Sequence, residues 1–210
     1  MKHRLRVLWL SLCLIVPVAH AASMTPVSGK DYELLKPAQA TAAPKGKVEV
    51  TEFFWYGCPH CAEFESPLEA WARKEGDKIA LKRVPVAMNS ALTPHSRMYY
   101  ALNALGVSER MMPILFDAIG QQGQPLLTPQ DQATFLSKYG VNRAQYLQTY
   151  YSARVQADVA RAAKLIRDER IVGVPTVTVA GKYETGPGYT GSLEATTSVL
   201  DYLVKQVDAS

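Results

Sequence analysis

The tetrapeptide Cys58-Pro59-His60-Cys61 holds the residues of this 210-residue chain that are best suited to chemistry. Two cysteines with two residues between them can form a disulfide with each other, and they can exchange that disulfide with another protein. The only other cysteine, Cys13, lies in an apolar segment near the N-terminus. We therefore expect Cys58 and Cys61 to act as a pair.

The position of the pair at the start of a predicted helix makes Cys58 the more reactive sulfur. Free backbone N–H groups and the helix dipole at a helix N-terminus favour a thiolate. Pro59 suits the first helical position because its missing N–H would have no helical partner there. His60 adds a hydrogen-bond donor, and a positive charge when it is protonated. These features lower the pKa of the Cys58 thiol and make the disulfide oxidising. Cys61, one turn further on, should be less exposed, and we expect it to resolve the mixed disulfide or to re-form the internal bridge.

Three other uses of a Cys-x-x-Cys pair fit the chain less well. A structural zinc ion needs four ligands. Beyond residue 21, the histidines that could complete a site with the two cysteines are only His60 and His95. Covalent haem attachment needs a histidine directly after the second cysteine, where this chain has Ala62. A permanent structural disulfide that closes so short a loop would stabilise the fold little. We therefore predict thiol–disulfide exchange with no metal, and with no cofactor other than the Cys58–Cys61 disulfide.

The N-terminal segment has the three parts of a secretory signal peptide. Basic residues at positions 2, 4 and 6 precede an apolar run over residues 8–18, and Ala19-His20-Ala21 fits a signal-peptidase site. The apolar run is shorter than the roughly 20 residues that span a bilayer as a helix, so an uncleaved anchor is the weaker alternative. We predict cleavage after about Ala21, which would remove Cys13, and export to an oxidising environment.

Removal of residues 1–21 would change the charge as well as the length. The chain has 23 Lys and Arg against 19 Asp and Glu, and three of the basic residues lie in the leader. The remaining 189 residues would be almost neutral and long enough for one domain, or for one domain with an insertion. We therefore expect no nucleic-acid partner, and we expect a monomer.

Hydrophobic periodicity and turn residues predict a core of strands that is interrupted by helices. Predicted strands over residues 47–55 and 79–86 flank a helix over 58–74. Helices follow over 93–169 with a break near Ser152, and threonine-proline pairs at Thr93 and Thr128 mark two of their starts. A hairpin over 176–180 and 183–185 and a helix over 193–207 end the chain.

This order of elements predicts an α/β protein with a mixed central sheet flanked by helices. The strands on either side of the helical stretch would need each other to make a sheet, so an insertion explains the order better than two sequential domains do. We predict one domain from residues 22–87 and 171–210, and an inserted all-helical domain over residues 88–170.

A second motif, Gly173-Val174-Pro175-Thr176, directly precedes the returning strand. Proline is unusual there because it removes a hydrogen-bond donor from the sheet and restricts the residue before it. The pattern predicts a tight turn. On sequence alone, both a cis and a trans bond between Val174 and Pro175 remain open.

With these motifs the chain resembles the DsbA family of bacterial thiol:disulfide interchange proteins, which belongs to the thioredoxin superfamily. The resemblance rests on Cys58-Pro59-His60-Cys61 after Glu52-Phe53-Phe54, and on Val174-Pro175-Thr176 over a hundred residues later. The helical insertion and the secretory leader agree with it. It covers essentially the whole chain after the leader.

The resemblance implies a thioredoxin fold with an inserted helical domain and a cis proline at Pro175 beside the Cys pair. It also implies that the backbone around Val174 pairs with a substrate peptide as an added strand. The implied partners are unfolded or folding exported proteins with free thiols, and a membrane quinone reductase of the DsbB type that would reoxidise the pair.

Glu52 occupies an apolar face of its predicted strand, because it alternates with hydrophobic residues there. Its position matches a glutamate found in the DsbA family. We interpret it as a buried acid that moves protons for Cys61, and a solvated glutamate near a strand end is the alternative. Lys82 is its predicted partner across the sheet.

His95 opens a predicted helix and has no evident partner nearby, so we interpret it as structural. Several methionine and tyrosine side chains are candidates for an adaptable peptide groove, although their helical spacing favours core packing for most of them. These residues are Met88, Met98, Met111, Met112, Tyr99 and Tyr100.

The predicted function is that of a periplasmic dithiol oxidase, which donates its disulfide to newly exported proteins through a mixed disulfide at Cys58. Two alternatives remain open. A disulfide isomerase or reductase on the same fold usually carries a dimerisation domain ahead of the catalytic part, and residues 22–46 leave no room for one. A peptide-binding chaperone with an incidental cysteine pair would not need Cys58 for its activity.

Overall fold

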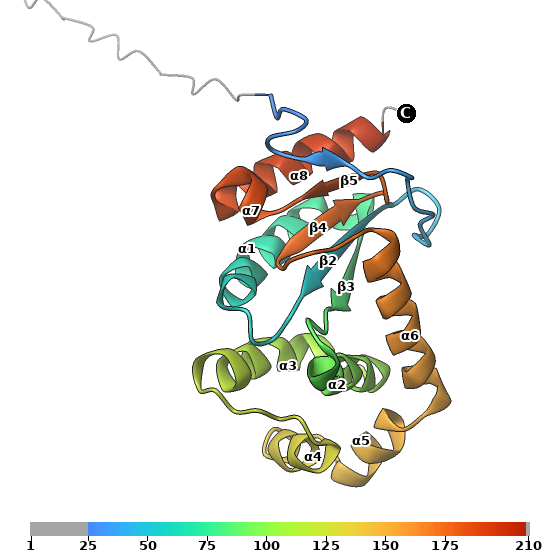
Figure 1. Ribbon diagram of the computed structural model, residues 1–210, viewed down its shortest axis with the longest axis vertical. Coiled ribbons are helices and arrows are strands. Elements are labelled where there is room, and N and C mark those ends of the chain that lie inside the picture. The colour runs from blue at the N-terminus through green and yellow to red at the C-terminus, as the bar shows by residue number, and fades with distance from the viewer. Residues whose placement is uncertain (1–24, 209–210) are drawn as a thin grey trace, which may run out of the picture.

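The computed structural model describes residues 25–208. The leader predicted over residues 1–21, with its cleavage point, lies outside these residues. None of the helices in the described part of the chain combines the length and the apolar character that a bilayer-spanning helix needs. A sheet with helices packed against it occupies one half of the molecule, and a group of helices occupies the other half (Figure 1).

Strand β2 (Val48–Phe54) lies inside a sheet with the strand order β1-β5-β4-β2-β3. It pairs in parallel with β3 (Ile79–Pro85) and antiparallel with β4 (Thr176–Val179), so the sheet is mixed, as predicted. The strands β5 (Tyr183–Thr185) and β1 (Glu33–Leu34) continue it to the far edge. Six of the seven residues of β2 are buried, which explains its nearly continuous apolar sequence.

Helices cover both faces of this sheet. On one face, α1 (Pro59–Glu75) and α8 (Leu193–Asp208) pack on a buried apolar cluster. That cluster includes Val48, Val50, Phe64, Leu68, Trp71, Val177, Leu200 and Leu203. On the other face, α6 (Ala153–Asp168) contributes Ala162, which packs with Phe53.

The helices between β3 and β4 form a second core. They are η2 (Ser90–Leu92), α2 (Thr93–Ala104), α3 (Ser108–Leu115), the π-helical η3 (Phe116–Gln121), α4 (Pro129–Ser137), α5 (Arg143–Tyr150) and α6. Phe54, Cys58 and Cys61 belong to the same buried cluster as the side chains of these helices. The Cys pair therefore lies where the two cores meet. The division of the chain into residues 22–87 with 171–210, and residues 88–170, stays a prediction.

Local capping signals account for several of the helix starts. Thr128 is an N-cap, as predicted, and the predicted break near Ser152 is the N-cap of α6. Each hydroxyl accepts a hydrogen bond from the N–H three residues later, at 3.1 and 3.3 Å. The predicted cap at Thr93 is wrong, because a 3₁₀ turn capped by Asn89 precedes it and Thr93 already belongs to α2. The short helix α7 (Pro187–Thr190) was not predicted.

Candidate active site

Cys58 is the N-cap of α1 and follows β2 by a short turn. Its N–H donates to the Trp55 carbonyl at 3.0 Å, and its carbonyl accepts from the N–H groups of Cys61 and Ala62 at 3.1 and 3.2 Å. Pro59 takes the first helical position, as predicted. Among the described residues, no side chain caps this helix. The start of α1 therefore leaves its free N–H groups to the sulfur of Cys58.

The two sulfur atoms lie in different environments, although both thiols are free. Cys58 is 8 % exposed and Cys61 is 0 % exposed, so Cys61 is the less accessible of the two, as predicted. The pKa of Cys58 is lowered to about 6, chiefly by a hydrogen bond with the Cys61 thiol. Burial acts in the opposite direction. The backbone N–H groups of Cys61 and His60 and the charge of His60 lower the pKa further. The same hydrogen bond and burial raise the pKa of Cys61. At neutral pH the pair therefore holds one thiolate and one thiol.

His60 lies on the open side of the pair. Its side chain is 75 % exposed, and its Nδ1 atom lies 3.2 Å from Oε2 of Glu63. Its charge and its backbone N–H both favour the thiolate of Cys58. The influence of His60 on the Cys58 sulfur is therefore electrostatic.

The turn before β4 brings the second motif against the first. The Val174–Pro175 peptide bond is cis, which is the isomer that the family resemblance implies. The Val174 carbonyl lies 3.5 Å from the Cys58 sulfur, which donates to it when protonated. The Thr176 hydroxyl closes the turn by donating to the Gly173 carbonyl at 2.9 Å. Two motifs that are far apart in the sequence thus form one site.

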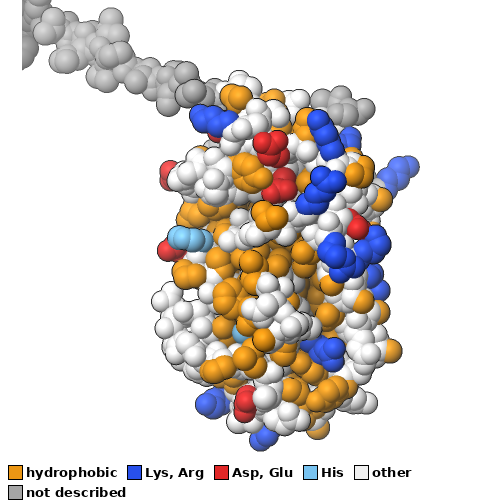
Figure 2. Space-filling view, viewed as in Figure 1, with side chains coloured by type: hydrophobic (Ala, Val, Ile, Leu, Met, Phe, Trp, Pro, Cys, Tyr) orange, Lys and Arg blue, Asp and Glu red, His pale blue; other side chains and the backbone are white. Residues whose placement is uncertain are grey.

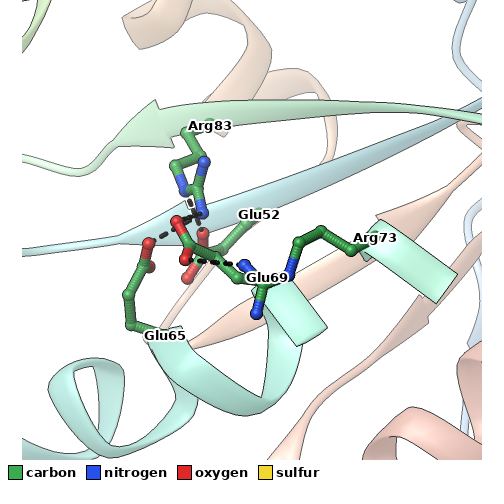
Figure 3. Close-up of polar contacts among 5 residues, drawn as sticks. All are labelled: Glu52, Glu65, Glu69, Arg73 and Arg83. Carbon is green, nitrogen blue, oxygen red and sulfur yellow. Dashed lines mark hydrogen bonds and ion pairs between the residues drawn. The ribbon is translucent and has the colours of Figure 1, made fainter. Parts of the chain in front are cut away.

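Beneath α1, Glu52 belongs to a buried cluster of charges with Arg83 at its centre (Figure 3). Nε of Arg83 donates to Glu52 at 3.1 Å, and Nη2 donates to Glu65 at 2.7 Å and to Glu69 at 3.3 Å. The side chains of Arg83 and Glu52 are 8 % and 0 % exposed. One guanidinium group therefore faces two buried carboxylates, Glu52 and Glu65, and a third, Glu69, which is 35 % exposed and also pairs with Arg73 at 3.4 Å.

This excess of carboxylates changes their proton affinity. Burial raises the pKa of Glu52 to about 7 and that of Glu65 to about 8, although Arg83 acts in the opposite direction. Three buried atoms here have no hydrogen-bond partner among the described residues: one carboxylate oxygen of Glu52, one of Glu65, and the hydroxyl of Tyr56. The charge of Glu52 also raises the pKa of the Cys61 thiol. Near neutral pH the cluster can therefore hold or release a proton beside Cys61.

The predicted pairing of Glu52 with Lys82 is wrong. Successive side chains of a strand point to opposite faces, and Arg83 is the residue of β3 in register with Glu52. The ammonium group of Lys82 lies instead 3.7 Å from Glu49, on the other face of the sheet. Glu52 is therefore buried, as expected, but its partner is Arg83, the residue that follows Lys82 in β3.

Two further members of the cluster, Glu65 and Glu69, were not predicted. Glu65 follows Cys61 by four residues, and Glu69 follows Glu65 by four, so the three side chains share one side of α1. Because Cys61 faces the core, this spacing was the available signal. It was hidden by the polar character of α1, whose acidic residues resemble those of a solvated helix face.

The other singled-out residues are mostly parts of the core. Met98, Met111 and Met112 are at most 1 % exposed and pack among the helices, whereas Met88 is 49 % exposed. Tyr99 is buried and Tyr100 is partly buried against the same cluster. His95 is buried, but the expectation that it lacks a partner is wrong, because it is hydrogen-bonded on both sides of its ring.

Comparison with known proteins identifies the family. Residues 49–196 match the family described as DSBA-like thioredoxin domain. The chain belongs to the DsbA family. It is 53 % identical over 207 residues to the thiol:disulfide interchange protein DsbA of Burkholderia cepacia, which covers 99 % of this chain and 98 % of the relative. It is 38 % identical over 189 residues to the protein of that name from Azotobacter vinelandii, with 89 % and 88 % covered.

Solved structures of DsbA proteins have the same fold. The crystal structure of Pseudomonas aeruginosa DsbA is similar with a TM-score of 0.83 at 34 % identity, and the match covers 88 % of this chain and 95 % of that one. The oxidoreductase NmDsbA1 of Neisseria meningitidis is similar with a TM-score of 0.77 at 28 % identity, with 87 % and 94 % covered. The predicted thioredoxin-like fold is therefore confirmed.

Membership of the DsbA family makes this protein a thiol:disulfide oxidoreductase. The Cys58–Cys61 pair supplies the two sulfur atoms that the chemistry needs and is consistent with a dithiol oxidase. Among residues 25–208, no group of three or more His, Cys, Asp or Glu side chains is placed to hold a metal ion.

Proposed function

We propose that this DsbA-family protein is an exported dithiol oxidase that passes the Cys58–Cys61 disulfide to other proteins. The observation that carries the proposal is the difference between the two sulfur atoms, because the pKa of Cys58 is lowered to about 6 while that of the more deeply buried Cys61 is raised. A thiolate that is stable in the reduced protein favours reduction of the protein's own disulfide and hence oxidation of the substrate. Pro59 and His60 assist Cys58.

The exchange takes place in two steps. In the first, a substrate thiolate attacks Cys58 of the oxidised protein, so that a substrate–Cys58 disulfide forms and the Cys58–Cys61 bond breaks. Cys61 leaves as a thiolate, which then takes up a proton. In the second, another substrate thiolate attacks the substrate sulfur of the mixed disulfide, and Cys58 leaves as its stabilised thiolate. The substrate dithiol becomes a disulfide, the protein retains one proton on Cys61, and one proton goes to solvent.

Glu52 is suited to supply the proton that Cys61 takes up and to remove it again on reoxidation. Its carboxyl group is fully buried, its pKa is raised to about 7, and one of its oxygens has no partner among the described residues. Arg83 links it to Glu65 and to Glu69, whose side chain is 35 % exposed. The cluster thus extends from the Cys pair towards solvent.

Val174 and Pro175 are the proposed contacts for the substrate backbone. The Val174 carbonyl receives a hydrogen bond from Cys58 only while that thiol is protonated. In the thiolate or disulfide form, the carbonyl is free to accept an N–H from an extended peptide, which would add as a strand. Val172, two residues earlier, is 91 % exposed. Figure 2 shows further hydrophobic side chains gathered across the middle of one face, where unfolded chains would find apolar contacts.

The leader and the family resemblance support the remaining parts of the proposal. The protein would act in the periplasm as a monomer after cleavage near Ala21. Its substrates would be unfolded or folding exported proteins with free thiols, and a DsbB-type membrane quinone reductase would restore the Cys58–Cys61 disulfide. The disulfide would be its sole redox group, and no nucleic acid would be involved.

The experiment that tests this function follows the loss of thiols in a reduced, unfolded protein mixed with the oxidised chain. We expect the wild-type protein to form substrate disulfides stoichiometrically and Cys58→Ser to be inactive. Cys61→Ser, loaded at Cys58 with glutathione, should form a stable mixed disulfide with a substrate that carries a single cysteine. A Cys58→Ser variant that supports refolding as well as wild type would favour the chaperone instead. Faster rearrangement of scrambled disulfides than oxidation of dithiols would favour the isomerase.

A further inference from the structure

Trp55 lies at the end of β2 and contacts both cysteines through its backbone. Its carbonyl accepts a hydrogen bond from the Cys58 N–H at 3.0 Å. Its own N–H interacts with the Cys61 sulfur and lowers the pKa of that thiol, although other effects raise it more. Its ring covers Gly57, where an added Cβ would lie 2.4 Å from two ring carbons. The position of Trp55 therefore determines how the backbone holds the Cys pair.

The indole ring of Trp55 is held from the helical half of the molecule by His95, near the start of α2. Its Nε1 donates to Nδ1 of His95 at 3.1 Å, and the planes of the two rings lie at 23° to each other. The other ring nitrogen of His95, Nε2, lies 2.7 Å from the carbonyl oxygen of Pro125. His95 is only 3 % exposed, so water does not compete for these contacts.

The two partners of His95 determine where its hydrogen lies. An indole N–H can only donate and a backbone carbonyl can only accept. Nδ1 must therefore be the acceptor for Trp55, and Nε2 must carry the hydrogen that is donated to Pro125. The neutral imidazole satisfies both contacts, and burial favours this form because it lowers the pKa of His95. His95 thus forms a defined connection between the Pro125 loop and Trp55.

We propose that His95 is a positioning residue for disulfide exchange, which acts through Trp55 on the Cys58 thiolate. With His95 in place, the Trp55 ring stays over Gly57 and its carbonyl holds the turn that presents the N–H groups of α1 to the sulfur. Without an acceptor, the indole N–H is unpaired and the ring moves towards water, so the turn loosens and the thiolate loses hydrogen bonds. The inference rests on the proposed role of Cys58 as the thiolate, not on the direction of exchange.

The test is the titration of the Cys58 thiolate by its ultraviolet absorbance in two variants of His95. Phenylalanine cannot accept a hydrogen bond, whereas glutamine can accept from Trp55 and donate to Pro125 in the way the neutral imidazole does. We expect His95→Phe to raise the pKa of Cys58 by about half a unit, a change of about threefold in the thiolate-to-thiol ratio. His95→Gln should titrate as the wild type does.

A matched control comes from the same group of helices. Ser152→Ala removes the N-cap of α6, where the serine hydroxyl accepts a hydrogen bond from the Val155 N–H at 3.3 Å. This variant should lose stability without any change in the titration of Cys58. An equal shift in the control would show that loss of stability alone moves the thiol, and it would overturn the proposal.

Two further outcomes would also overturn the proposal. One is an unchanged Cys58 titration in folded His95→Phe, and the other is an equal shift in the phenylalanine and glutamine variants of His95. If His95→Phe does not fold, Trp55→Phe, which keeps His95, must give the same upward shift. The titration needs no substrate protein, so a wild type that oxidises no dithiols would refute the proposed function without changing the result expected here.

Discussion

The difference in stability between the reduced and the oxidised protein should grow as the pH rises. Cys58 has a pKa of about 6 in the folded, reduced protein, against an ordinary value of 9.0 for a thiol. A depressed pKa contributes stability that is fully present above the unfolded value and is lost as the pH falls through the folded value. In the oxidised protein the sulfur is part of a disulfide and cannot ionise, so only the reduced form gains this contribution.

The two pKa values of Cys58 determine the size of the effect. They give a contribution to the free energy of unfolding of about 2.7 kcal/mol at pH 8, about 1.4 kcal/mol at pH 7 and less than about 0.1 kcal/mol at pH 5. The Cys61 thiol adds almost nothing below pH 8, because its raised pKa keeps it protonated in the folded protein. Glu52 and Glu65 titrate in the same range, but they are present in both redox forms and largely cancel in the difference.

The assay is urea unfolding of both forms at several values between about pH 5 and pH 8, with the difference in unfolding free energy plotted against pH. We expect this difference to rise by about 2.5 kcal/mol over this range. Reduced Cys58→Ser, which has no ionisable sulfur at that position, serves as the control. The difference in unfolding free energy between this variant and the oxidised wild type should not rise with pH. A difference between the wild-type forms that stays constant with pH would refute the stabilised thiolate.

Four substitutions give further tests. Arg83→Met should lower the free energy of unfolding by about 3–5 kcal/mol in urea unfolding, because the buried carboxylates lose their cation. A loss of stability below about 1 kcal/mol would contradict this prediction. Glu52→Gln should slow the steps that protonate or deprotonate Cys61 by about tenfold or more in stopped-flow exchange, with an unchanged Cys58 titration as its control. Val172→Asp should raise KM for apolar peptides and change the unfolding free energy by no more than about 0.5 kcal/mol, since the residue is 91 % exposed. Thr128→Ala should cost about 1 kcal/mol of stability through the lost N-cap and leave the exchange rate unchanged.

The sequence was sufficient for the features that depend on local chemistry. Cys58 at a helix start, Pro59 at the first helical position and the break at Ser152 all follow from rules that act within a few residues, and the structure has each of them. The mixed sheet also followed, because the order of strands and helices along the chain restricts how they can pair.

The features that the sequence did not provide depend on register or on distant contacts. Arg83, not Lys82, faces Glu52, and a shift of one residue in the pairing of β2 and β3 would have reversed that choice. Trp55 and His95 meet across 40 positions of the chain, and no periodicity connects a strand end to a helix in another half of the molecule. The choice of the cis isomer at Pro175 likewise needed the family resemblance or the structure.

The equilibrium between the Cys58–Cys61 disulfide and glutathione at neutral pH shows whether the pair gives its disulfide away. We expect a reduction potential above the roughly −270 mV of thioredoxin. The lowered pKa of Cys58 alone favours the reduced form by about 1.4 kcal/mol at pH 7, which corresponds to about 30 mV. A potential at or below that of thioredoxin would contradict the claim that this pair gives its disulfide away.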